Sequence, residues 1–436
     1  MNKKIILITF VTPSCENIRG TSALPYHLII GARTNVLYDN ETANGNDMFG
    51  RCRGSNFYNN ENLNENLIIY SFNNNKLSNE EIREVEKELG AMIKIIPLPK
   101  WYVWMFKYHL LFLRLFLKYP FVNYIKLSQN FVSEIDAQNP DLIWVMGEEL
   151  SRIVKQFPSQ KRIQIGPDTE SLYYYRMLGR RFVMNNPLSF WKNALMYRKY
   201  ARMEREFCTD KEFIYYAVGE EDIRHLQQLT PNVQAMFLRH PHYEVSPQLK
   251  VESGEMKTFH SPKIKLLIAG QYNLYMKQDA DLLVEQIYDK ANVNDNFLKK
   301  HYMLTFLGKG WDKHVERLQK VGYEVNHIRF APNYIEEICK HDIQITPISI
   351  GTGTKGKVLD AFANGLLVIG TPFALENIAA KHNESCVEYT HAKEVIEVLS
   401  DIPNNVHKYE EMAAKGNQQV LEYHNRAKIA HELFGL

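Results

Sequence analysis

Residues 343–378 decide the fold and have the sequence IQITPISIGTGTKGKVLDAFANGLLVIGTPFALENI. The run from Ile343 to Ile350 is apolar and rich in β-branched residues, which predicts a buried strand. Three glycines between positions 351 and 356 interrupt this pattern, and Lys357–Asn364 is predicted to form a short helix that ends at Gly365. A second apolar run, Leu366–Ile369, predicts another buried strand. The stretch is therefore expected to be a β-α-β unit with a glycine-rich turn before its helix.

This turn predicts a binding site for a phosphate group. A turn that leads into a helix directs several backbone N–H groups to one side, and the helix dipole adds partial positive charge there. Two lysines stand beside the turn, and Asp360 follows Lys357 by three residues, on the same face of the helix. Its carboxylate is then placed to accept hydrogen bonds from ribose hydroxyls, although a tight turn without a ligand is the alternative. The candidate donor-binding residues of this segment are Gly351, Thr352, Gly353, Thr354, Lys355, Lys357 and Asp360.

Two other nucleotide-binding motifs match the turn only in part. Residues 351–356 fit G-x-G-x-x-G, but the acidic residue expected about 20 positions later has only Glu376 as a candidate. Residues 351–357 fit the start of a P-loop, and Val358 then stands where Ser or Thr must reach magnesium. Dinucleotide and P-loop enzymes also carry this loop after the first strand of their domain, whereas here it lies late in the chain.

The stretch resembles the donor-site segment of GT-B glycosyltransferases of the retaining family 4, or group 1, type. In that family a strand that ends in Pro is followed by a Gly-rich segment and then by K-x-L-E-A-x-A-x-G-x-P-V-V-x-T. Asp360 stands where the family usually has Glu, and Thr352 stands where it often has a second Glu. The residues that follow the pattern in register are Pro347, Gly351, Gly353, Lys357, Leu359, Ala361, Ala363, Gly365, Val368, Ile369 and Thr371.

The resemblance implies an α/β protein with two Rossmann-like, doubly wound domains that face each other across a cleft. It also implies transfer of a sugar from a UDP- or GDP-sugar to a hydroxyl acceptor with retention of configuration, as in bacterial surface polysaccharide or glycoconjugate synthesis. The expected partners are the nucleotide-sugar and a glycan or lipid-linked acceptor, and neither a metal nor another cofactor is expected. Gln271 and Thr352, which depart from the family pattern, keep a second hypothesis open. It is a catalytically inactive scaffold or glycan- or nucleotide-binding protein.

The bulk composition agrees with a cytoplasmic protein of two domains. A chain of 436 residues favours two domains, and a net charge of +2 gives no reason to expect a nucleic-acid partner. Five scattered cysteines lack metal-ligand spacing, which is typical of a reducing compartment. The predicted domains are an acceptor domain over residues 1–245, a linker over 246–262 and a donor domain over 263–415. Residues 416–436 are predicted to form a helix that crosses back to the first domain.

Further site candidates follow from the resemblance. The loop after the first strand contains Gly20, and Gly270 ends the first strand of the second domain, seven residues before Lys277. In the family a lysine near that place contacts the diphosphate. Asp168 and Glu170 follow a predicted strand and are candidates for the acceptor side, with N-capping of the next helix as the alternative. The predicted catalytic residues are Asp168, Glu170, Lys277 and Lys357.

Residues 101–120, WYVWMFKYHLLFLRLFLKYP, form the other unusual stretch. As one helix, this stretch would place Lys107, Arg114 and Lys118 along one line of an otherwise apolar surface. Such a helix is typical of attachment to the surface of an anionic membrane, so a peripheral position on the inner face is one prediction. The alternative is a core helix whose lysines extend to solvent. A second basic zone covers residues 152–211, with 13 Lys and Arg against 5 Asp and Glu.

Overall fold

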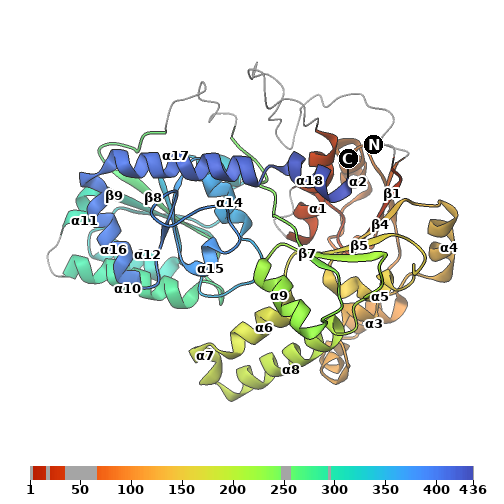
Figure 1. Ribbon diagram of the computed structural model, residues 1–436. Helices are drawn as coiled ribbons and strands as arrows, with labels where there is room; N and C mark the ends of the chain where they lie inside the picture. Colours follow the sequence, from red (N-terminus) through yellow and green to blue (C-terminus); the bar gives the residue numbers. More distant parts are fainter. Residues whose placement is uncertain (1–2, 16–19, 35–65, 247–256, 293–295, 436) are drawn as a thin grey trace. The chain divides into compact units, whose positions relative to one another are not determined.

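The computed structural model describes residues 3–15, 20–34, 66–246, 257–292 and 296–435. The described chain divides into two compact units. The first unit runs to Arg239 and includes Arg426–Leu436, and the second contains His240–Asn425. Each unit is a parallel sheet covered by helices (Figure 1). The expected α/β class of two Rossmann-like domains is confirmed.

The sheet of the first unit has the order β3-β2-β1-β4-β5-β6-β7, and all its neighbouring strands are parallel. Its strands are β1 Ile5–Thr9, β2 Leu67–Ser71, β3 Met92–Ile95, β4 Leu142–Met146, β5 Arg162–Gly166, β6 Phe213–Ala217 and β7 Ala235–Phe237. Its helices are α1 Gly20–Arg33, α2 Asn79–Leu89, α3 Lys100–Lys107, α4 Gln129–Ala137, α5 Ser151–Val154, α6 Glu170–Leu178, α7 Arg181–Met184, α8 Pro187–Glu204, α9 Glu220–Leu229 and α18 Arg426–Phe434.

The sheet of the second unit has the order β10-β9-β8-β11-β12-β13 and is also parallel. Its strands are β8 Ile264–Ala269, β9 Tyr302–Leu307, β10 Val325–Ile328, β11 Ile343–Thr346, β12 Leu367–Gly370 and β13 Val387–Glu388. Its helices are α10 Lys277–Asn292, α11 Phe297–His301, α12 Asp312–Lys320, α13 Tyr334–Ile338, α14 Gly356–Ala363, α15 Pro372–Leu375, α16 Ala392–Asp401 and α17 Val406–Tyr423.

The central strands are apolar on both faces because each sheet has a core on both sides. In β1, Ile6 and Ile8 enter one hydrophobic cluster, while Ile5 and Leu7 enter the other. The strand β8 behaves in the same way, with Leu266 in one cluster of the second unit and Leu267 in the other. Continuous apolar runs in the sequence are therefore buried parallel strands.

The predicted helix over residues 416–436 is two helices in the structure, α17 and α18. His424 lies between them, and its Nδ1 is 2.7 Å from the carbonyl oxygen of His240. Its own carbonyl accepts a hydrogen bond from the backbone N–H of His242 at 2.9 Å. These contacts hold His424 outside a helical path. Beyond this break, α18 packs on α1, where Gly31 lets the backbone of Arg426 approach closely.

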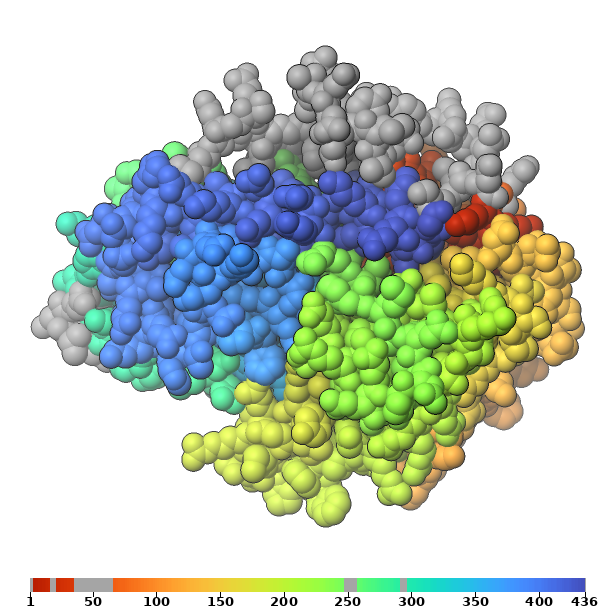
Figure 2. All heavy atoms as spheres, in the orientation of Figure 1, coloured from red at the N-terminus to blue at the C-terminus, as the bar shows by residue number. Residues whose placement is uncertain are grey.

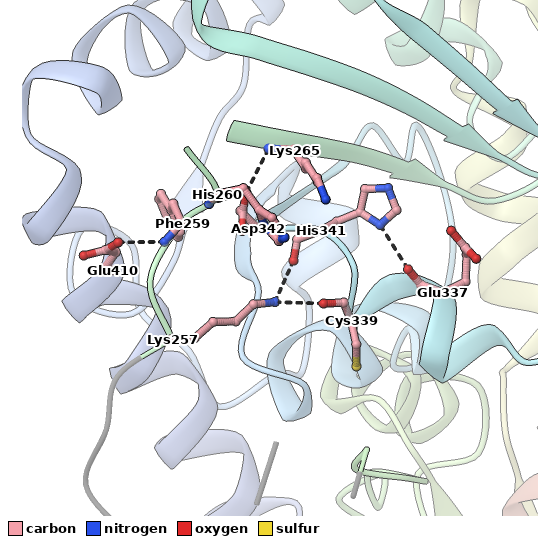
Figure 3. A network of polar contacts seen from close by, with 9 residues as sticks. All are labelled: Lys257, Phe259, His260, Lys265, Glu337, Cys339, His341, Asp342 and Glu410. Carbon is pink, nitrogen blue, oxygen red and sulfur yellow. Dashed lines mark hydrogen bonds and ion pairs between the residues drawn. The ribbon is translucent and has the colours of Figure 1, made fainter. Parts of the chain in front are cut away.

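A buried carboxylate fixes the chain where it enters β8. Asp342 is fully buried directly before β11, and its Oδ2 accepts hydrogen bonds from the backbone N–H groups of His260, at 3.1 Å, and Lys265, at 2.8 Å. Its Oδ1 lies 2.7 Å from Nδ1 of His260 (Figure 3). The same network holds Lys257, which donates to the carbonyl of His341 at 2.6 Å. The start of β8 is thereby fixed beside the start of β11. The expected linker, residues 246–262, lies mostly outside the described residues.

Residues 101–120 do not form one helix, so the predicted line of three cations is wrong. The helix α3 ends at Lys107, and His109 has a left-handed backbone with φ 54°, which a continuous helix cannot contain. A 3₁₀ helix, η2, then covers Leu110–Phe116. The core alternative is also wrong, because Tyr102 is the one buried residue of α3 and η2 has none. None of the described helices is both long enough and apolar enough to span a membrane.

Candidate functional site

The candidate site lies in the second unit, where the path of the chain across the sheet reverses. From β8 the chain moves outward through β9 to β10, and it then returns to β11 on the other side of β8. The loops that follow two such neighbouring strands leave in opposite directions, which opens a crevice at their carboxyl ends. Here these loops begin at Gly270, after β8, and at Pro347, after β11. The predicted donor-binding segment therefore lies at the place where doubly wound sheets bind ligands.

The β-α-β unit predicted from the sequence is present. The strand β11 ends at Thr346, earlier than expected, because Pro347 has no N–H group to continue the sheet. Gly353 has a φ of 59° and Gly365 a φ of 73°, so both occupy conformations that favour glycine. The helix α14 starts at Gly356.

Lys355 holds the turn together. Its Nζ donates hydrogen bonds to the carbonyl oxygens of Thr352, at 2.5 Å, and Gly353, at 2.9 Å. Gly351 makes room for this contact, since a Cβ there would lie 2.6 Å from Cε of Lys355. The charge of Lys355 therefore stabilises the carbonyl groups of the turn.

The first turn of α14 has no side-chain cap within the part of the chain that the structure describes. A helix N-terminus attracts an anion through its dipole and its first N–H groups, and in this turn the N–H of Val358 donates to the carbonyl of Lys355 at 2.9 Å. Lys357 stands in this turn, with its Nζ 5.3 Å from the ring centre of Tyr334 in α13. Burial lowers the pKa of Lys357, and the nearby carboxyl of Asp360 partly offsets this effect.

Asp360 and Tyr334 are buried polar groups that lack partners. Among the described residues, neither Oδ1 of Asp360 nor the hydroxyl of Tyr334 has a hydrogen-bond partner. Burial, with repulsion from Glu244, raises the pKa of Asp360 to about 8. Burial also raises the pKa of Tyr334, and the Asp360 carboxylate adds to the rise. Buried polar groups normally have partners, and a polar ligand at this turn would supply one to both.

The neighbouring loop after β8 is closely packed. Gly270 has a φ of 140°, and a Cβ on Gly308 would lie 2.2 Å from the carbonyl oxygen of Gly270. The loop is tied to the β11 loop through Ser349, whose N–H donates to the carbonyl of Tyr275 at 2.7 Å. The hydroxyl of Ser349 accepts a hydrogen bond at 2.9 Å from the N–H of Asp279, in the first turn of α10. Sequence analysis missed Ser349 because its role depends on a contact between distant segments.

Lys277 has partners close to it in sequence. Its Nζ lies 2.7 Å from Oδ2 of Asp281 and 2.6 Å from the hydroxyl of Tyr272. The hydrogen bonds with Asp281 and Tyr272 raise the pKa of Lys277. The structure thus brings together the residues of the 351–360 segment and Gly270, whereas the ammonium group of Lys277 is engaged by a carboxylate on its own helix.

The other predicted residues lie in the first unit. Gly20 is the first residue of α1, and residues 16–19 before it lie outside the described part of the chain. Asp168 and Glu170 follow β5, at the start of α6. Burial, with repulsion from Asp168, raises the pKa of Glu170 to about 8.

Three buried carboxylates cap α6, and Thr169, its N-cap residue, makes no side-chain capping hydrogen bond. Asp222 accepts from the N–H of Thr169 at 2.7 Å, and Glu148 accepts from the N–H of Glu170 at 3.2 Å. Glu204 accepts from the N–H of Ser171 at 3.0 Å. Sequence analysis missed these residues, although Glu148 directly follows a glycine after a predicted strand, which marks the carboxyl edge of the sheet.

Comparison with known proteins agrees with this geometry. Residues 263–405 match the family described as glycosyl transferases group 1. HepE of Anabaena, solved in complex with UDP-glucose, superimposes with a TM-score of 0.58 at 10% identity, covering 100% of this chain and 99% of that one. The chain has the GT-B fold.

Two further GT-B structures are similar over their whole length. A glycosyltransferase from Rickettsia africae has a TM-score of 0.57 at 11% identity and covers 100% of this chain and 98% of its own. WaaG, a glycosyltransferase involved in lipopolysaccharide biosynthesis, has a TM-score of 0.55 at 12% identity, with 99% and 100% covered. No protein of curated function is significantly similar to this GT-B chain in sequence. The resemblance predicted from residues 343–378 is confirmed for the GT-B fold and for the group 1 match of the second unit.

Proposed function

We propose that this protein transfers a sugar from a nucleotide-sugar donor to a hydroxyl group of an acceptor, with retention of configuration. The observation that carries the proposal is the first turn of α14, which lies at the chain reversal of a unit that matches group 1 glycosyl transferases. This turn contains Lys357, and Oδ1 of the nearby Asp360 has no hydrogen-bond partner among the described residues. HepE, which was solved with UDP-glucose, and WaaG have the same fold. HepE supports a UDP-sugar as donor, and WaaG supports a role in bacterial surface polysaccharide or glycoconjugate synthesis. A GDP-sugar is the other donor that we propose to test, and the proposed location is the cytoplasm.

In this reaction the bond between the anomeric carbon and the donor phosphate breaks, and the acceptor oxygen forms the new glycosidic bond. The acceptor hydroxyl loses its proton, and negative charge develops on the leaving diphosphate. Backbone N–H groups of α14 and the ammonium group of Lys357 stabilise that charge, and fixed donors of this kind reduce barriers strongly in buried sites. Because this positive charge comes from the chain, we propose that transfer needs neither a metal nor another cofactor.

Asp360 is proposed to bind the ribose of the donor. With a pKa of about 8 it is mostly neutral at pH 7 before a ligand binds. A ribose hydroxyl supplies the partner that Oδ1 lacks, and the ribose itself does not change during the reaction. On the acceptor side, we propose Asp168 and Glu170, at the carboxyl edge of the first sheet, as the residues that contact the glycan or lipid-linked acceptor.

One observation favours a second candidate function, a protein that binds nucleotide-sugar without turnover. Lys277, the other expected diphosphate contact, is engaged by Asp281 and Tyr272. Thr352 also stands where a carboxylate is common in the family. A scaffold of this kind would keep donor affinity and lack both transfer and donor hydrolysis.

Measurements of donor binding and donor hydrolysis distinguish a glycosyltransferase from a protein that only binds the donor. Thermal stabilisation by UDP-, GDP- and ADP-sugars identifies the donor, because a ligand at 100 times its Kd stabilises by about 2.7 kcal/mol. Release of free nucleotide from the stabilising donor then reports turnover. We expect both for the wild type, and we expect Lys357→Ala to weaken both. If a donor stabilises the protein against heat but no free nucleotide is released, even with acceptor mixtures present, the protein is a nucleotide-sugar-binding protein. If no donor stabilises it, both functions are contradicted.

A further inference from the structure

The segment of α3 and η2 exposes large apolar side chains in a folded protein. Phe116 is 82% exposed and Trp104 is 59% exposed. The segment is nevertheless anchored, because Tyr102 stacks on Phe121 with a ring separation of 4.9 Å and packs edge-on against Phe10 at 5.9 Å. The apolar surface is therefore presented by a fixed element. Its exposed large apolar residues are Trp101, Val103, Trp104, Phe106, Tyr108, Phe112, Leu113, Leu115 and Phe116.

A second group of exposed apolar residues lies where α7 passes into α8. Leu188 is 84% exposed and Trp191 is 71% exposed. Both belong to α8, which together with α7 stands out at the border of the first unit (Figure 2). The two segments are connected, because Lys199 of α8 donates from Nζ to the carbonyl oxygens of Arg114, at 2.5 Å, and Leu115, at 3.0 Å. This buried lysine fixes α8 against the end of η2.

The sequence around both groups of exposed apolar residues is basic. No Asp or Glu occurs between positions 89 and 133, a range with six Lys and Arg, or between 171 and 203, a range with seven. Exposed cations stand next to the apolar residues in each segment, among them Lys107, Arg181 and Lys192. Apolar side chains flanked by these cations are complementary to anionic lipid head groups over acyl chains, and Glu206, whose Oε1 lies 3.7 Å from Nζ of Lys118, is a carboxylate at the edge of this surface.

The topology places both segments on one side of the first unit. The strands of its sheet are all parallel, so the connections that follow β3 and β5 leave at the same edge. The helix α3 follows β3, and the α6–α8 segment follows β5. Asp168 and Glu170, the proposed acceptor contacts, start α6 at that edge, and nine helical residues of α6 span only about 14 Å.

We propose that Trp104, Phe112, Phe116, Leu188 and Trp191, with their flanking cations, form a docking surface for an anionic membrane. Tryptophan prefers the boundary between head groups and acyl chains, and the lysines and arginines bind the lipid phosphates. Attachment through two segments orients the first unit, whereas one helix would leave it free to rotate. The carboxyl edge of the sheet then faces the membrane, where a lipid-linked hydroxyl acceptor is found.

Flotation of the purified protein with vesicles tests this proposal without any transfer reaction, so it stands or falls independently of the proposed function. Vesicles of phosphatidylcholine with 30% phosphatidylglycerol are expected to carry the protein upward, and pure phosphatidylcholine vesicles to carry much less. High salt is expected to weaken binding, because screening reduces the attraction. Absence of flotation with anionic vesicles at low salt would overturn the proposal.

Three variants locate the surface. Trp104→Ser/Phe116→Ser and Leu188→Ser/Trp191→Ser are each expected to reduce the bound fraction, because each removes one of the two attachments. Lys107→Gln/Arg181→Gln/Lys192→Gln is expected to lower the partition coefficient by about fivefold per charge. The matched controls, Leu282→Ser/Phe330→Ser and Lys313→Gln/Lys381→Gln/Lys393→Gln, change exposed residues of the second unit and should bind as the wild type does.

Circular dichroism and sedimentation velocity complete the test. Folded, monomeric variants with reduced flotation would support the docking surface. Unchanged flotation of both apolar variants would overturn it. A wild-type dimer that the apolar variants convert to monomers, without any effect on flotation, would show instead that a second copy covers this face.

Discussion

Lys357 is the residue whose removal tests the donor site most directly. Lys357 stands in the first turn of α14, where charge develops on the leaving diphosphate in the proposed reaction. We expect Lys357→Ala to lower kcat and to raise KM, with a loss of about 2–4 kcal/mol in transition-state stabilisation, as for other fixed oxyanion donors. Steady-state kinetics measures both parameters, and Lys381→Ala, an exposed lysine of the same unit, is the control. Unchanged kinetics in folded Lys357→Ala would place the donor elsewhere.

Asp360 makes a separate prediction about stability and pH. Its pKa is about 8 in the folded chain, above the usual value of 3.8, so the folded state keeps a proton that the unfolded state loses. This residue therefore reduces the free energy of unfolding progressively as pH rises from about 4 to about 8. Asp360→Asn cannot ionise, and we expect its stability relative to the wild type to increase between pH 5 and pH 8. Urea denaturation at several pH values measures this difference, and a difference independent of pH would contradict the assigned pKa.

The same substitution is expected to affect binding more than chemistry. Asn keeps the shape of Asp but cannot form the carboxylate that we expect to accept from the ribose when the donor is bound, and the loss of one such hydrogen bond costs about 1 kcal/mol. Because the ribose does not change in the reaction, KM should rise about fivefold while kcat stays nearly constant. Steady-state kinetics at pH 7 decides this, and a large fall in kcat with constant KM would show that Asp360 acts on the transition state instead.

At the residue scale, the sequence predicted which residues lie around the turn better than it predicted which groups their side chains contact. The motif placed Gly351, Gly353, Lys357 and Asp360 correctly around one turn. It could not show that Lys355 binds the carbonyl groups of its own turn, because several flexible conformations of a lysine fit the same spacing. The capping carboxylates of α6 also come from three distant elements, and a contact of that kind leaves no local pattern.

At the element scale, buried strands were predictable, and the break after α3 was not. A strand in a doubly covered parallel sheet is apolar over most of its length, as β1 is, so its sequence allows few alternatives. Residues 101–120 contain no Gly or Pro before Pro120, and nothing local predicts the left-handed backbone of His109. The packing of Tyr102 and the binding of η2 by Lys199 are tertiary contacts that override helix propensity there.

The packing of α18 on α1 gives a prediction for this pair of helices. A Cβ on Gly31 would lie 2.3 Å from the carbonyl oxygen of Arg426 and 3.2 Å from Cβ of Ala430. Gly31→Ala therefore forces the helices apart, and we expect it to destabilise the protein by about 1–3 kcal/mol, as overpacking usually does. Gly179→Ala is the control, since its Cβ would meet an atom only at 3.6 Å. Urea denaturation compares them, and equal stability of the two variants would show that α18 does not pack on α1 in solution.

At the scale of the whole molecule, two Rossmann-like units were predictable from chain length and from the two series of alternating strands and helices. The exact path of the chain was harder to predict. Helical periodicity continues from α17 into α18, and the bend between them depends on contacts of His424 with His240 and His242, far earlier in the chain. A sequence pattern records which residues favour a helix, whereas such a bend depends on which distant backbone groups they meet.

The last prediction concerns the reaction of the complete protein and its need for metal. In the proposed mechanism the diphosphate is stabilised by α14 and Lys357, so a divalent cation would add charge that the site already provides. We expect sugar transfer to keep its rate in EDTA, and we expect added magnesium or manganese to change it less than twofold. The kinetic parameters of the wild type with EDTA, and after addition of each metal, test this expectation. The same measurement on Lys357→Ala is an additional test, because a metal that restores the activity of this variant would act in place of the lost ammonium group. Loss of wild-type transfer in EDTA, with recovery on adding either metal, would instead show that the leaving group depends on a cation and that the helix and the lysine are insufficient.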